Sequence, residues 1–290
     1  MFSEKVLSRR QLWKHLCSFS GECMKAIDII EIIEKHAPLG YAAPWDKSGV
    51  QVAALREEIR SVAVMLDPTL ESLARAADAG ADFILAHHPL SMQPRYPDRR
   101  DDYLSILSLL FKADIWLYSA HTSLDANPDG PVRWLAQELD LRSLEILEPG
   151  AAAGPAAPCC GFGFSGLLPA TLTYADFCRL LGSALGGDSW QVCGPRPERV
   201  ARVACCPGAG GGLLGEAAAS GADVFITGDI KYHTALEARS MGLHVLDVGH
   251  FILEEEMMRR FAATMTSVLS VPVAFVPGSD PLTAGRPVRA

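Results

Sequence analysis

Short apolar runs alternate with amphipathic segments along most of the chain. The segment AIDIIEIIEKHAP is typical of a helix, because four of its five isoleucines fall largely on one stripe and it ends in a proline; the four are Ile27, Ile30, Ile32 and Ile33. Further along, the apolar runs SVAVMLD, DFILA and IWLYSA are separated by helical patterns such as TLESLARAADAG. Strands that alternate with helices predict βαβ units and a largely parallel sheet.

The same pattern suggests two lobes. A stretch rich in Ala, Gly and Pro at residues 148–158 is typical of a linker or an exposed loop, and the alternation of strands and helices resumes after it. We therefore expect an α/β fold with two lobes and mostly parallel sheets. One α/β lobe is expected to contain residues 24–140 and 221–290, with residues 141–220 inserted as a second α/β lobe. Residues 1–23 precede every pattern and are expected to be a dispensable N-terminal extension.

Histidines and carboxylates stand where apolar runs stop. The pair His87-His88 follows ADFILA, and two further pairs follow IWLYSA and LHVLDVG; these are His121 with Asp125 and His250 with Glu254. Open α/β sheets bind ligands at the carboxyl ends of their strands. Three separate segments would therefore bring imidazoles and carboxylates to one edge, which is the composition of a metal site with nitrogen and oxygen ligands.

Taken singly, each of these residues also has an ordinary structural interpretation. The adjacent histidines could form a surface turn with one structural histidine, and Asp125 could cap a helix that begins near Pro131. His250 and Glu254 are four residues apart, so they could be an intrahelical pair on a solvated face. We expect His121 to lie behind a metal ligand and to orient it through a hydrogen bond.

Two other segments also end strands. In TGDIKYH, Asp229 could cap the next helix, while Lys231 and His233 could contact an anionic or polar substrate. The glycine-rich stretch 208–212 could bind an anion through backbone N–H groups. It lacks the Lys-Ser/Thr of a P-loop, however, so a turn that requires glycine is the favoured interpretation.

Composition narrows the function classes. The chain has 290 residues and a formal net charge of −8, which gives no electrostatic case for binding nucleic acid or an anionic membrane. No run approaches the roughly 20 apolar residues of a membrane span. The eight cysteines include no CxxC pair, so reduced thiols in a cytoplasmic protein are expected. The N-terminal segment lacks the apolar region of a secretory signal; it could be a weak organelle presequence or an extension before an internal start at Met24.

Five segments together resemble the signature of one family. From Pro44 to Glu254, in this order, they are PWDKSGVQV, ILAHHPL, HTSLD, DVFITGDIKYH and DVGHFILE. They are similar to the Nif-three-like family, whose bacterial members are known as GTP cyclohydrolase 1 type 2 homologs. The resemblance implies a two-domain α/β fold that assembles into toroidal hexamers. The chain departs from the family pattern at Gly49-Val50 and at Ala53, where the family usually has Gly-Leu and a glycine.

The resemblance also implies a site and an activity. It assigns a pair of divalent metal ions to the side chains of His87, His88, Asp125, His250 and Glu254. Zinc, manganese, iron and cobalt all accept mixed imidazole and carboxylate ligands. We expect a metal-dependent hydrolase for a nucleotide-like substrate; with GTP, the resemblance implies attack at C8 of the guanine ring and loss of formate. The alternatives are a non-catalytic metal-binding or regulatory partner protein and a phosphoesterase.

Overall fold

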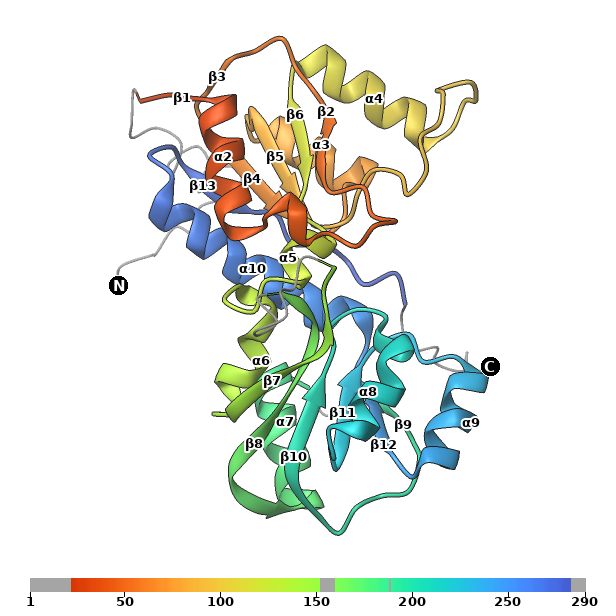
Figure 1. Cartoon of the computed structure of the whole chain (residues 1–290). Helices are drawn as coiled ribbons and strands as arrows, with labels where there is room; N and C mark the ends of the chain where they lie inside the picture. Colours follow the sequence, from red (N-terminus) through yellow and green to blue (C-terminus); the bar gives the residue numbers. More distant parts are fainter. Residues whose placement is uncertain (1–21, 152–159, 188, 283–290) are drawn as a thin grey trace, which may run out of the picture.

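The first lobe is built on a five-stranded sheet with helices outside it. The computed structural model describes residues 22–151, 160–187 and 189–282, and the lobe is the upper one in Figure 1. The sheet order is β13-β4-β5-β6-β2, and only β2 is antiparallel to its neighbour. In sequence order the strands are β2 (Gly49–Val52), β4 (Val62–Met65), β5 (Phe83–Ala86), β6 (Trp116–Ser119) and β13 (Val273–Phe275).

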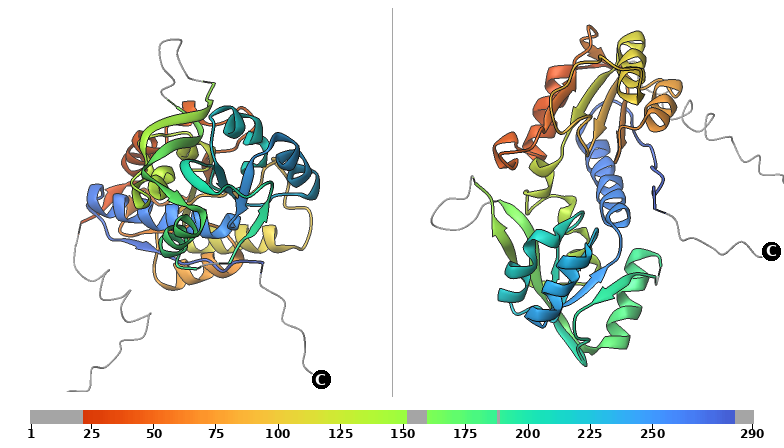
Figure 2. Two further views of the ribbon diagram at one scale, coloured as in Figure 1. Left: turned by 90° about the horizontal axis from the view of Figure 1, so that it is seen from below. Right: turned by 90° about the vertical axis from the view of Figure 1, so that its right-hand side faces the viewer.

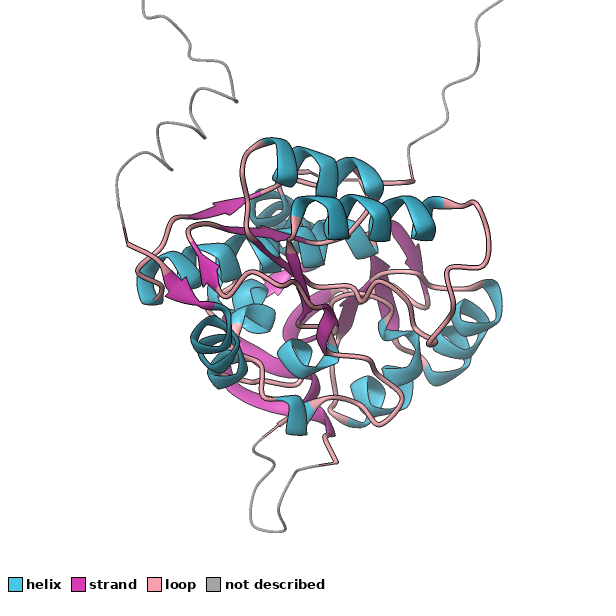
Figure 3. Ribbon diagram, turned by 90° about the horizontal axis from the view of Figure 1, so that it is seen from above, coloured by secondary structure: helices cyan, strands magenta, loops and turns pink. Residues whose placement is uncertain are grey.

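Helices cover this sheet, as the view in Figure 3 shows. They are α2 (Ala26–His36), α3 (Leu70–Asp78) and α4 (Asp102–Ala113), with the short η1 (Leu39–Tyr41) and α5 (Thr122–Asp125) near the strand ends. A two-stranded ribbon of β1 (Met24–Lys25) and β3 (Glu58–Ile59) completes the lobe. Side-chain caps fix where α3 and α4 begin, because Thr69 and Asp101 accept hydrogen bonds from backbone N–H groups of the first turn. The stripe of α2 is shifted from the predicted one, since Ile29, not Ile27, is buried with Ile30 and Ile33.

The second lobe contains a six-stranded mixed sheet. Its order is β7-β8-β10-β11-β12-β9; β10, β11 and β12 run parallel, and the other pairs are antiparallel. The strands are β7 (Arg142–Pro149), β8 (Gly161–Thr173), β9 (Gln191–Cys193), β10 (Arg199–Cys205), β11 (Val224–Thr227) and β12 (His244–Asp247). The helices are α7 (Tyr174–Leu185), η3 (Gly210–Leu213), α8 (Leu214–Ala219) and α9 (Tyr232–Met241).

This pairing differs from the expected division at residue 220. The sequence pattern places β11 and β12 in the first lobe, but they extend the second sheet from β10. All four residues of β11 are buried, as in β4 and β5. Buried parallel strands in both lobes therefore have the same apolar pattern, and the pattern does not reveal which sheet a strand joins. The chain returns to the first lobe only after β12.

Helix α10 (His250–Val268) joins the lobes. It lies at their junction in the right-hand view of Figure 2, and its side chains Leu253, Met257 and Phe261 are buried in a core shared by both sheets. Before it, η2 (Pro131–Arg133) and α6 (Trp134–Glu138) lead into the second lobe. The indole N–H of Trp134 donates a hydrogen bond to the carbonyl of Leu253, 3.0 Å away. The position of α10 is thus fixed from both sides.

Two predicted segments lie wholly or partly outside the residues that the structure describes. The predicted N-terminal extension lies outside the described residues except for its last two positions, and the Ala/Gly/Pro-rich stretch lies outside them from residue 152 on. In the part that the structure describes, no helix is long and apolar enough to span a bilayer. The α/β fold expected from the sequence is confirmed.

Candidate metal centre

Histidines from both lobes meet at the ends of the strands. His87 and His88 follow β5 directly, His121 lies beyond β6, and His250 begins α10 after β12. The ring centroid of His88 is 5.0 Å from that of His87, 5.6 Å from that of His121 and 5.4 Å from that of His250. The segments that the sequence predicted to converge therefore do so.

Each histidine is held through its Nδ1 atom. In the first pair, His87 Nδ1 lies 2.8 Å from the carbonyl oxygen of Ala120, and His88 Nδ1 lies 2.7 Å from Asp67 Oδ1. These oxygens accept hydrogen bonds, so Nδ1 is the donor in each case. The Nε2 atom of each ring is then the one that faces the other rings of the cluster.

The other two histidines repeat this arrangement with carboxylates. His121 Nδ1 lies 2.7 Å from Asp46 Oδ1, and His250 Nδ1 lies 2.9 Å from Asp229 Oδ2. Carboxylates behind imidazoles fix the tautomer and orientation of histidines that bind metals. Asp46 is itself held by Thr122, whose N–H and hydroxyl both donate to its Oδ2.

Two carboxylates lie among the Nε2 atoms. Glu254 Oε2 is 2.7 Å from His250 Nε2 and 3.1 Å from His88 Nε2, and its Oε1 is 3.7 Å from His87 Nε2. Asp125 Oδ1 is 3.6 Å from His87 Nε2. His250 and Glu254 are thus directed inward to the cluster and do not form a pair on a solvated face, since only 4% of Glu254 is exposed.

The centre of the cluster contains polar atoms that lack partners. Among the described residues, neither His87 Nε2 nor Asp125 Oδ1 has a hydrogen-bond partner, although both are buried. His88 Nε2 and His250 Nε2 face each other 3.4 Å apart. A buried polar atom without a partner costs about 1–3 kcal/mol, so two such atoms beside the facing imidazoles fit a site for a ligand or an ion.

The donor atoms fall into two groups that could each hold a metal ion. In both groups the atoms lie within 4.8 Å of one another; the first contains His87, His88 and His121, and the second contains His88, His250 and Glu254. His121 is therefore placed among the potential ligands, while Asp46 takes the orienting role expected of His121. Asp125 also does not cap η2, which follows Gly130 and has no side-chain cap.

The charges in the cluster stabilise one another. Burial lowers the pKa of His88, but hydrogen bonds with Asp67 and Glu254 outweigh it and raise the pKa to about 10. The hydrogen bond with Glu254 raises the pKa of His250 to about 9 against the effect of burial. Burial opposes ionisation of Glu254, but the charge of His87 and the histidine hydrogen bonds hold its pKa well below the usual range. The negative charge of the carboxylates thus favours the binding of protons and of metal cations to the cluster.

Glycines allow the second lobe to approach the cluster. At Gly208, φ is +69° and a Cβ would collide with Glu254 Oε1, so this position requires glycine. At Gly228, a Cβ would collide with the backbone nitrogen of His250. The next residue, Asp229, has φ +57°, a left-handed conformation that Asp tolerates, and its carboxylate reaches His250. The glycine-rich stretch therefore begins as a turn that requires glycine at Gly208, as favoured from the sequence, and continues into η3 from Gly210.

The sequence does not predict the orienting carboxylates Asp46 and Asp67, and it predicts two substrate contacts that lie away from the cluster. Asp67 comes two residues after β4 and so follows the same strand-end rule as the histidines. Lys231 and His233 are exposed, and in the described part of the chain no hydrogen bond or ion pair joins either side chain to the cluster. Of the side chains in TGDIKYH, that of Asp229 forms a hydrogen bond with the cluster.

The fold and the cluster define a two-lobed α/β protein with a candidate metal centre between its lobes. The profile of the Duf34/NIF3 (NGG1p interacting factor 3) family matches residues 24–281, and this chain belongs to that family. A relative from Clostridium perfringens, named GTP cyclohydrolase 1 type 2 homolog, is 32% identical over 255 residues, covering 87% of this chain and 95% of the relative. A relative of the same name from Methanocaldococcus jannaschii is 29% identical over 255 residues, covering 86% and 98%.

Solved structures share the fold. The structure titled reduced HcgD from Methanocaldococcus jannaschii is similar with a TM-score of 0.76 and 29% identity, covering 88% of this chain and 98% of that one. A hypothetical protein of Staphylococcus aureus is similar with a TM-score of 0.80 and 26% identity, covering 91% and 100%. The whole two-lobed architecture is therefore common to these proteins.

Proposed function

We propose that this chain binds two divalent metal ions and is a metal-dependent hydrolase that acts on a nucleotide-like substrate. The observation that carries the proposal is a pair of buried atoms that have no hydrogen-bond partner among the described residues, His87 Nε2 and Asp125 Oδ1. Beside them the Nε2 atoms of His88 and His250 face each other 3.4 Å apart. Divalent cations would satisfy these nitrogen and oxygen atoms together. The relatives' name, GTP cyclohydrolase 1 type 2 homolog, supports a nucleotide-like substrate.

The donor atoms suggest how two ions would be shared. His88, His250 and Glu254 would hold one ion, and His87 and His121 would hold the other. Asp125 Oδ1 lies 3.6 Å from His87 Nε2, and Asp125 would supply a further carboxylate ligand. Zinc, manganese, iron and cobalt all suit such mixed ligands.

The chain's own residues would prepare the site for hydrolysis. Two bound divalent ions lower the pKa of a bound water and stabilise negative charge that develops on a substrate. The side chain of His87 is fully buried, whereas those of His88 and His250 are 24% and 29% exposed. Water and substrate would therefore enter from the side of His88 and His250, and Asp67 and Asp229 would keep these two imidazoles in position.

The family resemblance and the net charge of the chain support proposals about its assembly, its location and its partners. We propose a homo-oligomer, a hexamer by resemblance to the family, that works in the cytoplasm and not at a membrane. The net charge of −8 argues against nucleic acid as a partner.

A substrate screen with metal-loaded protein tests the proposal. GTP, other nucleotides and p-nitrophenyl phosphate are incubated with the wild type, with Asp125→Asn and with Glu256→Gln, a control on another side of α10. Formate release from GTP that falls at least about 100-fold in Asp125→Asn but not in the control supports a cyclohydrolase. Release of phosphate alone identifies a phosphoesterase. Bound metal without turnover of any compound identifies a non-catalytic metal-binding or regulatory protein.

A further inference from the structure

A large aromatic side chain is exposed beside the metal centre. Trp45 is 59% exposed, and its ring lies edge-on to the ring of His121, with centroids 6.0 Å apart and planes at 72°. The His121 ring is in turn 5.2 Å from that of His87. One imidazole therefore separates the indole from the centre of the cluster.

The backbone that carries Trp45 is fixed on both sides. The N–H of Asp46 donates to the carbonyl of Ala43, 2.9 Å away, which closes a turn with Pro44 and Trp45 in the middle. Proline at the second position of such a turn sets its φ in advance. The N–H of Ala43 donates to Thr122 Oγ1, which itself donates to the Asp46 carboxylate. The turn is therefore tied to α5 at both ends, and the indole is held outside the core by a rigid support.

A polar groove begins next to this turn. It has a volume of about 350 Å³, within the range of small-molecule sites, and its lining includes Lys47, Ser48, Gln51, Leu90 and Ser91. Gln51 fixes both walls, because its Nε2 donates to the carbonyl of Lys47 and its Oε1 accepts from the N–H of Leu90. The groove also reaches Asp46, the partner of His121. Trp45, the groove and the metal centre thus share one short loop.

We propose that Trp45 is the platform on which a planar heteroaromatic ring of the substrate stacks, with the polar groups attached to that ring in the groove. This inference rests on the proposed hydrolase and adds the residue that would bind the base of its nucleotide-like substrate. An exposed side chain on a backbone that is already fixed needs less ordering before it can stack, which favours binding. Stacking on an indole places the ring one imidazole away from the proposed ions. Trp45 is then a binding residue that brings the ring to the reacting centre.

Equilibrium binding to metal-loaded protein tests this role without relying on turnover. The probes are guanosine and ribose 5-phosphate, which has no planar ring, and the variants are Trp45→Ala, Trp45→Phe and Trp190→Ala, a tryptophan control in the second lobe. Loss of a stacked base weakens binding by about five- to 150-fold, so Trp45→Ala should weaken guanosine binding by at least about tenfold. Trp45→Phe should stay within about threefold of the wild type, because a phenyl ring also stacks. Ribose 5-phosphate binding and metal content should not change.

Three results would overturn the inference. In the first the wild type fails to bind guanosine, and in the second Trp45→Ala binds it as tightly as the wild type does. In the third result Trp45→Ala changes the oligomeric state, which would mean that the indole covers a contact between copies of the chain. The results that would reject the hydrolase differ from those that would reject the role of Trp45. Guanosine binding that depends on Trp45 without turnover of any compound keeps the platform and rejects the hydrolase, whereas turnover that is unaffected in Trp45→Ala keeps the hydrolase and rejects the platform.

Discussion

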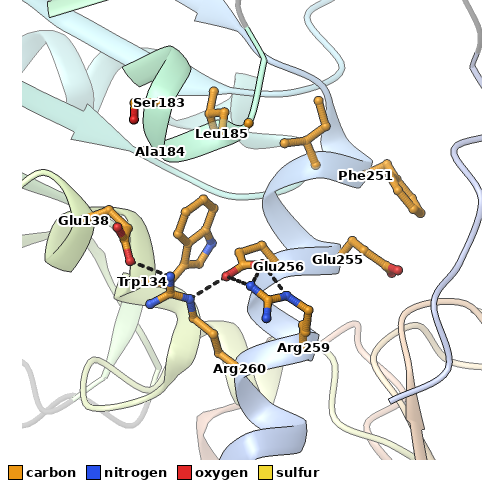
Figure 4. A pocket seen from close by; sticks show the side chains of 12 residues that line it. Trp134, Glu138, Ser183, Ala184, Leu185, Phe251, Glu255, Glu256, Arg259 and Arg260 are labelled. Atoms are coloured by element: carbon orange, nitrogen blue, oxygen red, sulfur yellow. Dashed lines mark hydrogen bonds and ion pairs between the residues drawn. The ribbon is translucent and has the colours of Figure 1, made fainter. Parts of the chain in front are cut away.

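Helix α10 carries two groups of charged side chains that differ in how their charges are balanced. One group is the candidate metal centre with His250 and Glu254. The other contains Glu256, about 200° round the helix from Glu254, together with Arg259 and Arg260. Figure 4 shows this second group at a cavity of about 390 Å³. There Arg260 pairs with Glu138 and with Glu256, at 2.6 and 2.7 Å, and Arg259 also pairs with Glu256.

The two groups differ in the sign of the charges that the chain supplies. In the second group two glutamates meet two arginines, so the chain supplies both signs of charge. The candidate metal centre contains five carboxylates, Asp46, Asp67, Asp125, Asp229 and Glu254. Within the described ranges, the ion pairs that they form are with histidine and none is with lysine or arginine. Imidazoles balance this charge only by holding protons. A group that is complete within the chain is structural, whereas a buried group that needs cations from outside is the better candidate for function.

Loss of one shared ligand should have the largest effect. We expect the wild type to bind about two divalent ions per chain after reconstitution, and His88→Ala to lose at least about 100-fold in affinity, because His88 belongs to both donor groups. Arg260→Ala should keep the wild-type metal content. Elemental analysis after dialysis against metal gives the stoichiometry. No bound metal in the wild type, or equal content in His88→Ala, would remove the distinction between the two groups.

Removal of metal should lower the free energy of unfolding by an amount similar to the loss of binding free energy expected for His88→Ala. The ligands come from residues 87–125 and 250–254, so bound ions tie α10 to the first lobe. A site saturated at about 100 times its dissociation constant adds about 2.7 kcal/mol to the free energy of unfolding. Thermal unfolding with and without EDTA measures the change, and Arg260→Ala should show the same drop as the wild type. An unchanged melting temperature after confirmed metal loss contradicts this role.

The sequence predicted the chemistry of the centre better than its surroundings. The ends of β5 and β6 are visible in the sequence, because each apolar run is followed by polar residues, His87-His88 after β5 and His121 after β6. The edge of a parallel sheet brings such strand ends together. The orienting role of Asp46 is not visible, because it depends on a loop that folds back by hydrogen bonds to Thr122. For the same reason His121 was expected behind a ligand and lies among the potential ligands instead.

The lobe boundary could not be read from the sequence for a different reason. Strand β11 has the apolar pattern of a buried parallel strand, and so does β4 in the other lobe. Which sheet each joins is decided by long-range pairing, here of Val203 with Val224. The balanced group on α10 was also not predicted, since Glu138 and Arg260 are far apart in the chain.

Substitution of an orienting carboxylate should have an intermediate effect. Asp67→Asn keeps the size of the side chain but weakens the hydrogen bond that holds His88 Nδ1. Changes to such partners typically cost about 10- to 100-fold in metal affinity. Glu138→Gln, in the balanced group, should leave the affinity unchanged. Competition with a metal indicator measures both; equal affinity in Asp67→Asn and the wild type would mean that His88 is held by packing alone.

Metal binding should depend on pH in a direction set by the histidines. In the metal-free protein the pKa of His88 is raised to about 10 and that of His250 to about 9, so both hold a proton at neutral pH. These protons stabilise the metal-free fold most fully below about pH 6.5, and that contribution is lost as the pH rises through about 9 to 10. Metal binds neutral imidazole, so affinity should rise about tenfold per pH unit for each proton displaced. Titration with metal in weakly buffered solution should release protons, and a titration without release contradicts the charge state described here.

The smallest effect is expected in the balanced group itself. Arg260→Ala removes two ion pairs and a contact in which the guanidinium carbon lies 5.3 Å from the centre of the Trp134 ring. Partly exposed pairs of this kind contribute little, so the free energy of unfolding should fall by roughly 1 kcal/mol or less. Chemical denaturation measures the loss, and metal content is determined on the same sample. If Arg260→Ala instead lost metal, the two sides of α10 would be coupled through the helix, and the balance of charge would no longer separate a structural group from a functional one.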